Sequence, residues 1–188
     1  MTINTKYILA SASPRRKELF SKISSDFSII PSNAEETLSN ELLAEEQSEY
    51  LAKIKALDIA EKYPNNIIIG ADTSVVIDNL ILGKPKDKNE AKQMLELISG
   101  RTHKVITGCA IVKNGVCLSF SDTTLVKFKT LTTAQIEEYV SSDEPYDKAG
   151  SYAIQGKAGA FIESIDGDFD NVVGLPTEKL KQKLNEVE

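Results

Sequence analysis

The stretch Ile67-Ile68-Ile69-Gly70-Ala71-Asp72-Thr73-Ser74-Val75-Val76-Ile77-Asp78-Asn79-Leu80-Ile81-Leu82 decides the fold class of this chain. Its β-branched residues favour strands, and the turn pair Asp78-Asn79 divides it into the two arms of a β-hairpin. A two-residue loop fixes how the arms pair, and this pairing continues down the ladder to Thr73 opposite Lys84. We therefore expect Asp72 and Lys84 to meet at the open end of the hairpin.

The segments on both sides of this hairpin alternate between strand and helix patterns. Ser13 stands directly before a proline as a preferred N-cap, and Thr132 opens a capping box. We expect strands over 7–10, 104–112 and 116–120 and helices over 14–23, 40–62, 87–99, 132–140 and 177–184. The second hairpin turns at Asn114-Gly115, which puts Cys109 opposite Phe120. Such alternation predicts a mixed α/β architecture.

Composition excludes several classes of protein. Lys and Arg number 22 against 28 Asp and Glu, and 41% of the 188 residues are hydrophobic. With no repeat or linker in view, we treat 1–188 as a single domain. The acidic balance argues against a nucleic acid polymer as partner but not against a small anion in a local basic pocket. No segment is long and apolar enough for a membrane span, and neither Cys109 nor Cys117 has disulfide or metal spacing, so we expect a cytoplasmic protein.

The motif Ser11-Ala12-Ser13-Pro14-Arg15-Arg16 places two arginines in the first turn of a helix. The positive end of the helix dipole disfavours cations there, so a bound anion would offset them. Free backbone N–H groups, serine hydroxyls and guanidinium groups together suit a phosphate chain. The alternative is that both arginines are solvated or pair with Glu18.

Two further places carry candidate chemistry. Asp72 stands in an apolar strand, where an ion is costly to bury without a partner. With Lys84 alongside, Asp72 suits a divalent cation or the activation of water, and Lys84 suits a phosphate oxygen; an exposed or paired aspartate is the alternative. The segment 144–159 combines charges with glycines, and its Gln155 can read a base edge, although a surface loop with turn glycines also explains it. His103, the sole histidine, is assigned a structural role.

Taken in chain order, these pieces resemble the Maf proteins. The resemblance covers nearly the whole chain and is carried by 8–16, 70–73, 82–85, 99–103, 147–150 and 173–176. It implies a nucleoside triphosphate pyrophosphatase that releases a nucleoside monophosphate and pyrophosphate with a divalent metal. It also implies an elongated Maf/ITPase-like mixed sheet, with two lobes around a central cleft, and a homodimer.

Three positions distinguish the branches of the family. Arg15, Thr73 and Gln155 match the branch that hydrolyses dTTP and UTP, whereas a sister branch acting on 7-methyl-GTP carries tryptophan, glutamine and glutamate. The resemblance therefore implies a dTTP/UTP pyrophosphatase. The alternative is a nucleotide-binding regulator of septum formation and cell division without significant turnover, since Maf proteins are also associated with septum inhibition.

The same resemblance implies a role for each site residue. Asp72 would accept the proton of the attacking water, and Glu36, beside the competing candidate Glu35, would be the acidic residue of the cleft. Glu36 and Asp72 would hold the metal, and their hard oxygen donors suit Mg²⁺ or Mn²⁺. The implied catalytic residues are Asp72, Lys84, Lys55 and Glu36, and the implied substrate-binding residues are Ser13, Arg15, Arg16, Thr73, Asp147, Lys148 and Gln155.

Overall fold

The expected hairpin forms the middle of the molecule. In the computed structural model, which describes residues 3–187, β3 (Ile67–Ile77) pairs with β4 (Leu80–Leu82). Ile77 lies opposite Leu80, as the two-residue turn predicts. Both residues of the turn, Asp78-Asn79, have positive φ angles of 50° and 61°, which matches the turn type that two-residue hairpins favour.

The ladder of this hairpin is shorter than predicted. It ends at Val75 opposite Leu82, and the expected pair of Thr73 with Lys84 does not form. The chain leaves the sheet directly after Leu82, where the next carbonyl accepts a hydrogen bond of 3.0 Å from the backbone N–H of Gly150. A contact with a distant segment therefore replaces the continuation of the ladder.

The whole sheet has seven strands in the order β2-β1-β3-β5-β6-β7, with β4 on β3. The strands β1 and β2 run parallel to each other, β1 runs parallel to β3, and the other pairs are antiparallel. Cys109 lies opposite Phe120, as predicted, but the second hairpin is longer than expected at both ends. The remaining strands are β1 (Tyr7–Leu9), β2 (Phe27–Ile29), β5 (Thr102–Lys113), β6 (Val116–Phe128) and β7 (Ile162–Asp166).

One edge of β3 is interrupted. Along its other edge, β3 pairs with β5 from residue 68 to residue 76. On the interrupted edge, β1 pairs with residues 67–69 and β4 with residues 75–77. Residues 70–74, which include Asp72 and Thr73, thus have no neighbouring strand on that side. The gap gives these two side chains access to an opening in the sheet.

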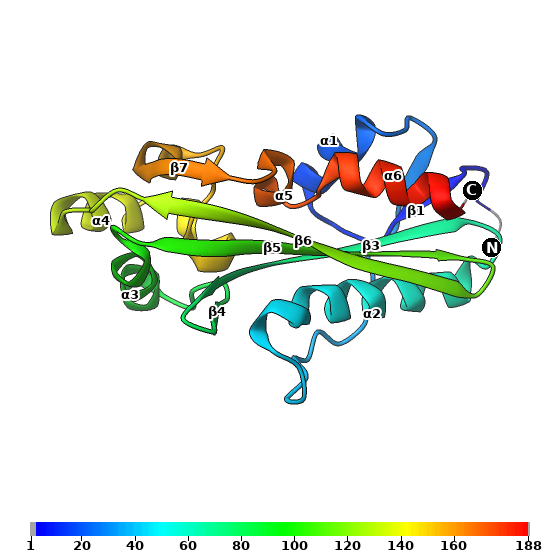
Figure 1. Cartoon of the computed structure of the whole chain (residues 1–188), viewed down its shortest axis with the longest axis horizontal. Helices are drawn as coiled ribbons and strands as arrows, with labels where there is room; N and C mark the ends of the chain where they lie inside the picture. The colour runs from blue at the N-terminus through cyan, green and yellow to red at the C-terminus, as the bar shows by residue number, and fades with distance from the viewer. Residues whose placement is uncertain (1–2, 188) are drawn as a thin grey trace.

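The helices cover both faces of the sheet. The helix α2 lies along one face, and α1 and α6 cover the other (Figure 1). The helices α3 and α4 lie at the far end of the long strands β5 and β6, so the molecule is elongated. The N-cap at Ser13 and the capping box at Thr132 both form as predicted. None of the described helices is both long and apolar enough to cross a membrane. The helices are α1 (Pro14–Ser21), α2 (Gln47–Lys62), α3 (Lys88–Ile98), α4 (Thr133–Val140), α5 (Phe169–Val173) and α6 (Thr177–Val187).

The helix α2 begins later than predicted. The apolar spacing suggested a start near residue 40, but Leu43 is 64% exposed and belongs to no buried stripe. The Gln47 side chain accepts a hydrogen bond from the backbone N–H of Ser39 and donates to the carbonyls of Ser39 and Leu42. These bonds fold residues 39–43 into a loop, and only a short 3₁₀ turn (Ala44–Glu46) precedes the helix. The strands β2 and β7 and the helix α5 were not predicted.

Two glycines let α2 lie directly on the sheet. A Cβ at Gly70 would stand 2.1 Å from the carbonyl oxygen of Ala52, and a Cβ at Gly108 would stand 2.2 Å from the backbone nitrogen of Glu49. Both distances are far below ordinary contact, so any side chain at these positions would push the helix away. Lys55 lies one turn after Ala52 on α2, so this close approach brings it next to the gap in β3.

The sole histidine lies in the core at the start of β5. His103 is 2% exposed, and its Nε2 is 2.7 Å from the hydroxyl of Tyr152. Its ring also contacts the ring of Phe128 edge-on. Burial lowers the pKa of His103 to about 4, so the imidazole is neutral at physiological pH. Its position is that of a packing residue and agrees with the structural role assigned to it.

Candidate active site

A cavity of about 460 Å³ opens beside the gap in β3. Its volume is typical of small-molecule sites. Segments from both ends of the sheet contribute to its walls, in agreement with the expected central cleft. The residues predicted for the site all line this one cavity: Ser13, Arg15, Arg16, Glu36, Lys55, Asp72, Thr73, Lys84, Asp147, Lys148 and Gln155.

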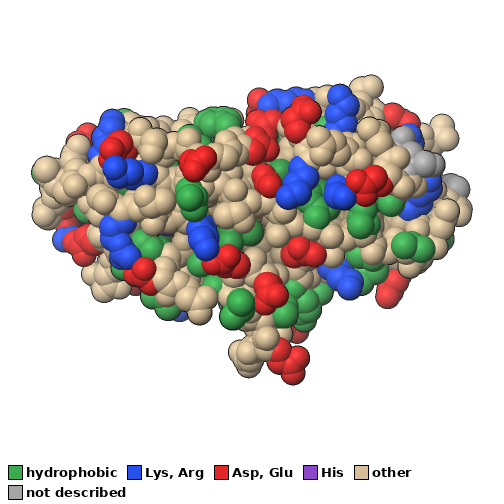
Figure 2. Space-filling view, viewed as in Figure 1, with side chains coloured by type: hydrophobic (Ala, Val, Ile, Leu, Met, Phe, Trp, Pro, Cys, Tyr) green, Lys and Arg blue, Asp and Glu red, His purple; other side chains and the backbone are tan. Residues whose placement is uncertain are grey.

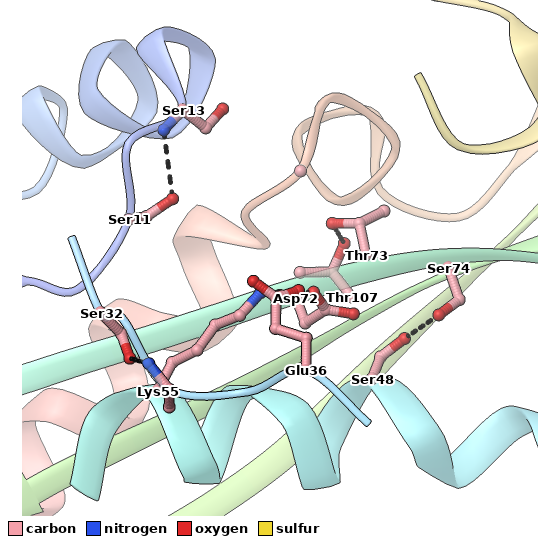
Figure 3. A network of polar contacts seen from close by, with 12 residues as sticks. Ser11, Ser13, Ser32, Glu36, Ser48, Lys55, Asp72, Thr73, Ser74 and Thr107 are labelled. Carbon is pink, nitrogen blue, oxygen red and sulfur yellow. Dashed lines mark hydrogen bonds and ion pairs between the residues drawn. The ribbon is translucent and has the colours of Figure 1, made fainter. Parts of the chain in front are cut away.

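The acidic part of the cavity centres on one lysine. The Nζ atom of Lys55 lies 2.7 Å from Oδ1 of Asp72 and 2.9 Å from Oε2 of Glu36 (Figure 3). Lys55 comes from α2, Asp72 from β3, and Glu36 from the loop between β2 and α2. The side chains of Lys55 and Asp72 are 10% and 14% exposed, so each charge depends on the other for compensation.

This arrangement fits a divalent cation held by two carboxylates. Because Glu36 and Asp72 both contact the Lys55 ammonium, the two carboxylates lie close together, and each has a second oxygen that this ammonium contact does not use and that could bind an ion. Within residues 3–187, no group of three or more His, Cys, Asp and Glu side chains forms a fuller metal site. Mg²⁺ is commonly bound by one or two carboxylates together with substrate phosphates, so the pair is sufficient for that kind of site. Glu35, the competing candidate, does not line the cavity.

The guanidinium group of Arg16 is fixed by three hydrogen bonds. Its Nε donates to the carbonyl of Gly174 at 2.8 Å, Nη2 to the hydroxyl of Thr73 at 2.9 Å, and Nη1 to the hydroxyl of Ser11 at 3.3 Å. A guanidinium has five N–H donors, so two lack a protein partner in the described chain. Burial lowers the pKa of Arg16 and Asp72 opposes this effect, but a guanidinium stays charged. Arg16 thus presents a fixed cation to the cavity.

Further cations surround the opening. Arg15 and Lys84 line the cavity, and neither makes an ion pair with any described residue. Lys148 forms an ion pair with its neighbour Asp147, and its hydrogen bond holds the pKa of that carboxyl below the usual range. Over the face drawn in Figure 2, acidic and basic side chains are otherwise intermixed. The positive groups that face the cavity suit a ligand with several negative charges.

The cavity also has an apolar part. Val75, Val105 and Tyr152 contribute to it, and the exposed side chain of Gln155 lines the same cavity. Gly150 approaches Val75 so closely that a Cβ there would stand 2.9 Å from the valine side chain, and its φ is +68°. Apolar walls together with an amide side chain are typical of sites that take a mostly apolar group with polar edges.

Sequence reasoning missed several residues that support the site. The hydroxyl of Ser11 was expected to suit a phosphate chain, but its bond to Arg16 was not foreseen, and Gly174 lies in a motif that was noticed but was given no role. Thr107, whose hydroxyl is hydrogen-bonded to that of Thr73, and Asn171, whose carbonyl accepts from Thr107, are both fully buried. Neither had been singled out from the sequence. The only sequence signal is a polar residue inside an apolar segment, which is too common to indicate a site.

The fold has a counterpart among solved structures. The Staphylococcus aureus Ham1 protein superposes with a TM-score of 0.59, covering 97% of this chain and 99% of that one. The two sequences are only 13% identical, so the likeness extends to the fold and no further. It agrees with the ITPase-like mixed sheet that the sequence led us to expect.

Comparisons of sequence identify the family. A Bacillus cereus protein named dTTP/UTP pyrophosphatase is 46% identical over 181 residues, covering 96% of this chain and 95% of its own. A Thermococcus gammatolerans protein of the same name is 50% identical over 171 residues, covering 91% of each. A family model described as Maf-like protein matches residues 6–187. Because the match spans nearly the whole chain and includes every wall of the cavity, this protein belongs to the Maf family.

Proposed function

We propose that this protein hydrolyses dTTP and UTP to the nucleoside monophosphate and pyrophosphate. The observation that carries the proposal is the meeting of Lys55, Asp72 and Glu36 in one cavity with Arg16 and Lys84. Relatives that share close to half of its residues are named for this activity. The cavity has the charge, size and mixed polarity that a pyrimidine nucleoside triphosphate requires.

The cationic residues would bind the triphosphate. Arg16 has two N–H donors left for phosphate oxygens, and Lys84 is unpaired within the described part of the chain. Preorganised cations stabilise the charge that develops on phosphate oxygens during transfer more than they stabilise the ground state. The three bonds that fix Arg16 provide this preorganisation.

Asp72 would act as the general base. Its carboxylate accepts one proton from a water molecule while the water oxygen attacks the α phosphorus. The bond between the α phosphorus and the bridging oxygen then breaks, and pyrophosphate leaves with the electron pair. Lys55 lies 2.7 Å from Asp72. Once Asp72 has taken up the proton, Lys55 can contact the phosphate oxygens instead of Asp72.

We further propose Mg²⁺ or Mn²⁺ as the cofactor, held by Glu36 and Asp72. When bound, such an ion supplies neutralising charge to the phosphate oxygens. The closeness of the two carboxylates, which both contact the Lys55 ammonium, supports this assignment, and the ion would use the oxygens that Lys55 does not contact.

The base would lie at the apolar end of the cavity. Gln155 offers both an amide donor and a carbonyl acceptor, which matches the alternating groups on the edge of thymine or uracil. Arg15 lines the same cavity and can contact the substrate directly.

The test is a nucleotide panel with each divalent ion in turn. Purified protein should release pyrophosphate from dTTP and UTP, and much less from 7-methyl-GTP. Tight binding of dTTP with no product in either Mg²⁺ or Mn²⁺ would refute the proposed activity and favour a regulatory, nucleotide-binding role. A preference for 7-methyl-GTP would refute the assignment of Arg15, Thr73 and Gln155 to the pyrimidine branch.

We also propose that the protein is a homodimer of the cytoplasm. Tyr50 and Leu57 stand seven residues apart on the outer face of α2 and are each 37% exposed, and such an apolar stripe suits contact with a second copy. The thiols of Cys109 and Cys117 are free, which suits a reducing compartment. Light scattering should give the mass of two chains, and cell fractionation should recover the protein with cytoplasmic enzymes; a monomer mass or a different fraction would refute the respective proposal.

A further inference from the structure

A continuous chain of hydrogen bonds leads from the cavity into the core. Nη2 of Arg16 donates to Oγ1 of Thr73 at 2.9 Å, and this oxygen lies 2.9 Å from Oγ1 of Thr107 on the adjacent strand β5 (Figure 3 labels both threonines). The hydroxyl of Thr107 in turn donates to the backbone carbonyl of Asn171 on α5 at 2.9 Å. The chain thus connects α1, β3, β5 and α5.

The direction of every bond in this chain follows from its last member. A carbonyl can only accept, so the single proton of the Thr107 hydroxyl points at Asn171. The oxygen of Thr107 must then accept from Thr73, which commits the single proton of Thr73 as well. Thr73 consequently presents only lone pairs to its other neighbours, and that is the form that the guanidinium of Arg16 requires.

The far end of the chain is rigidly anchored. Asn171 and Thr107 are both fully buried. Oδ1 of Asn171 accepts from the backbone N–H of Thr107 at 3.2 Å, and Nδ2 donates to the carbonyl of Val105 at 3.0 Å and to the hydroxyl of Thr124 at 2.9 Å. The Asn171 side chain therefore ties α5 to both β5 and β6.

The same segment holds Arg16 from a second side. Gly174, three residues after Asn171, accepts the Nε–H of Arg16 through its carbonyl at 2.8 Å. Asn171 and Gly174 thus determine two of the three bonds of the guanidinium group, one through the two threonines and one directly. A displacement of this short segment would change the orientation of Arg16.

We propose that Thr73 acts on the substrate through Arg16, as a positioning residue, and that Thr107 and Asn171 set the direction of its hydroxyl. The proposal rests on the proposed function and deepens it, because it concerns a residue that marks the pyrimidine branch. On this view the Thr73 proton is not available to the base, and threonine at this position serves to orient a phosphate-binding cation.

The test compares Thr107→Val, which removes the hydroxyl, with Thr107→Ser, which keeps it. Thr107→Val should lower kcat/KM for dTTP about 10-fold, which is the upper end of the cost of one lost neutral hydrogen bond, and Thr107→Ser should stay within about 3-fold of the parent. In an Arg16→Ala background the effect of Thr107→Val should disappear, since residues that act through one another are not additive. An equal loss with and without Arg16 would overturn the proposal, and so would full activity of Thr107→Val.

A second readout separates this proposal from the proposed function. The affinity for inorganic tripolyphosphate, measured by calorimetry, should weaken about 10-fold in Thr107→Val whether or not the protein hydrolyses pyrimidine nucleotides. Absence of turnover in the parent protein together with this weakening would refute only the proposed function; unchanged affinity would refute the positioning role.

Thr124→Val is the matched control. Thr124 is also a fully buried threonine bonded to Asn171, but it lies on β6, away from Arg16. The Thr124→Val variant should lower Tm by an amount similar to Thr107→Val, while its affinity for tripolyphosphate should equal that of the parent. Equal weakening in both variants would show that general packing of α5 causes the effect and would refute the directional chain.

Discussion

Replacing Gly108, which lies opposite Asp72 in the ladder of β3 and β5, with alanine should move α2 and disturb the site although no site residue is itself replaced. The added Cβ would stand 2.2 Å from the backbone nitrogen of Glu49, whereas ordinary contact begins at 3.4 Å. The helix must therefore retreat by the difference, about 1.2 Å. Because the obstacle is backbone, no rotation of a side chain relieves the clash.

The consequence for the site follows from the position of Lys55. A rigid retreat would lengthen its 2.7 Å contact with Asp72 by a comparable amount, and misplacements of about 1 Å can cost up to about 100-fold in rate. We expect Gly108→Ala to lose about 1–3 kcal/mol of stability, as overpacked cores do, and at least about 10-fold in turnover.

Thermal unfolding and steady-state pyrophosphate release measure the two effects. Gly83→Ala is the control, since a Cβ there would meet nothing within 4 Å, and it should behave as the parent. If Gly108→Ala kept both the Tm and the turnover of the parent, the close approach of α2 would not be what positions Lys55, and the reasoning would be refuted.

Three further predictions concern single side chains. Asp72→Asn should lower turnover by about 100-fold or more with a cooperative unfolding transition retained, because the general base is lost; a parent-like rate would contradict its role. Glu36→Gln should raise the Mg²⁺ concentration for half-maximal turnover about 10-fold, as loss of a metal ligand does, while Glu35→Gln should leave it unchanged; equal behaviour of the two in a metal titration would argue against Glu36 as a ligand. Burial lowers the pKa of His103 from 6.5 to about 4. As the pH falls, the unfolded chain therefore takes up a proton on this ring at a higher pH than the folded chain does. The stability that depends on the neutral ring is complete above pH 6.5 and is lost as the pH falls towards 4, by about 3 kcal/mol. The parent should therefore lose more Tm over this range than His103→Gln, and parallel losses would contradict the buried, neutral imidazole.

Local patterns predicted those elements whose causes are local. The N-cap at Ser13 and the capping box at Thr132 formed because a side chain and a backbone N–H within three residues satisfy each other. The hairpin registers at Asp78-Asn79 and Asn114-Gly115 were also correct, since a two-residue turn determines which residues face each other. In these cases the interacting groups are neighbours in the chain.

The errors arose where distant contacts compete with local preference. Residues 40–43 have helical spacing but fold against Gln47, and β4 stops at Leu82 because the next carbonyl bonds to Gly150. The short strands β2 and β7 exist only because a neighbouring strand provides their hydrogen bonds. Nothing in three to five residues of sequence indicates such a neighbour.

The site divides in the same way. The sequence alone determined which residues carry charge and which motifs stand in family order, and every residue chosen on that basis lines the cavity. Only the tertiary structure decided that Lys55 lies between Asp72 and Glu36, and that Arg16 bonds to Gly174 across a separation of 158 residues. The physical reason is that a side chain's identity is local, whereas its partners depend on how β3, α2 and α5 pack. The direction of the Thr73 hydroxyl is the clearest case, because a carbonyl on another element determines it.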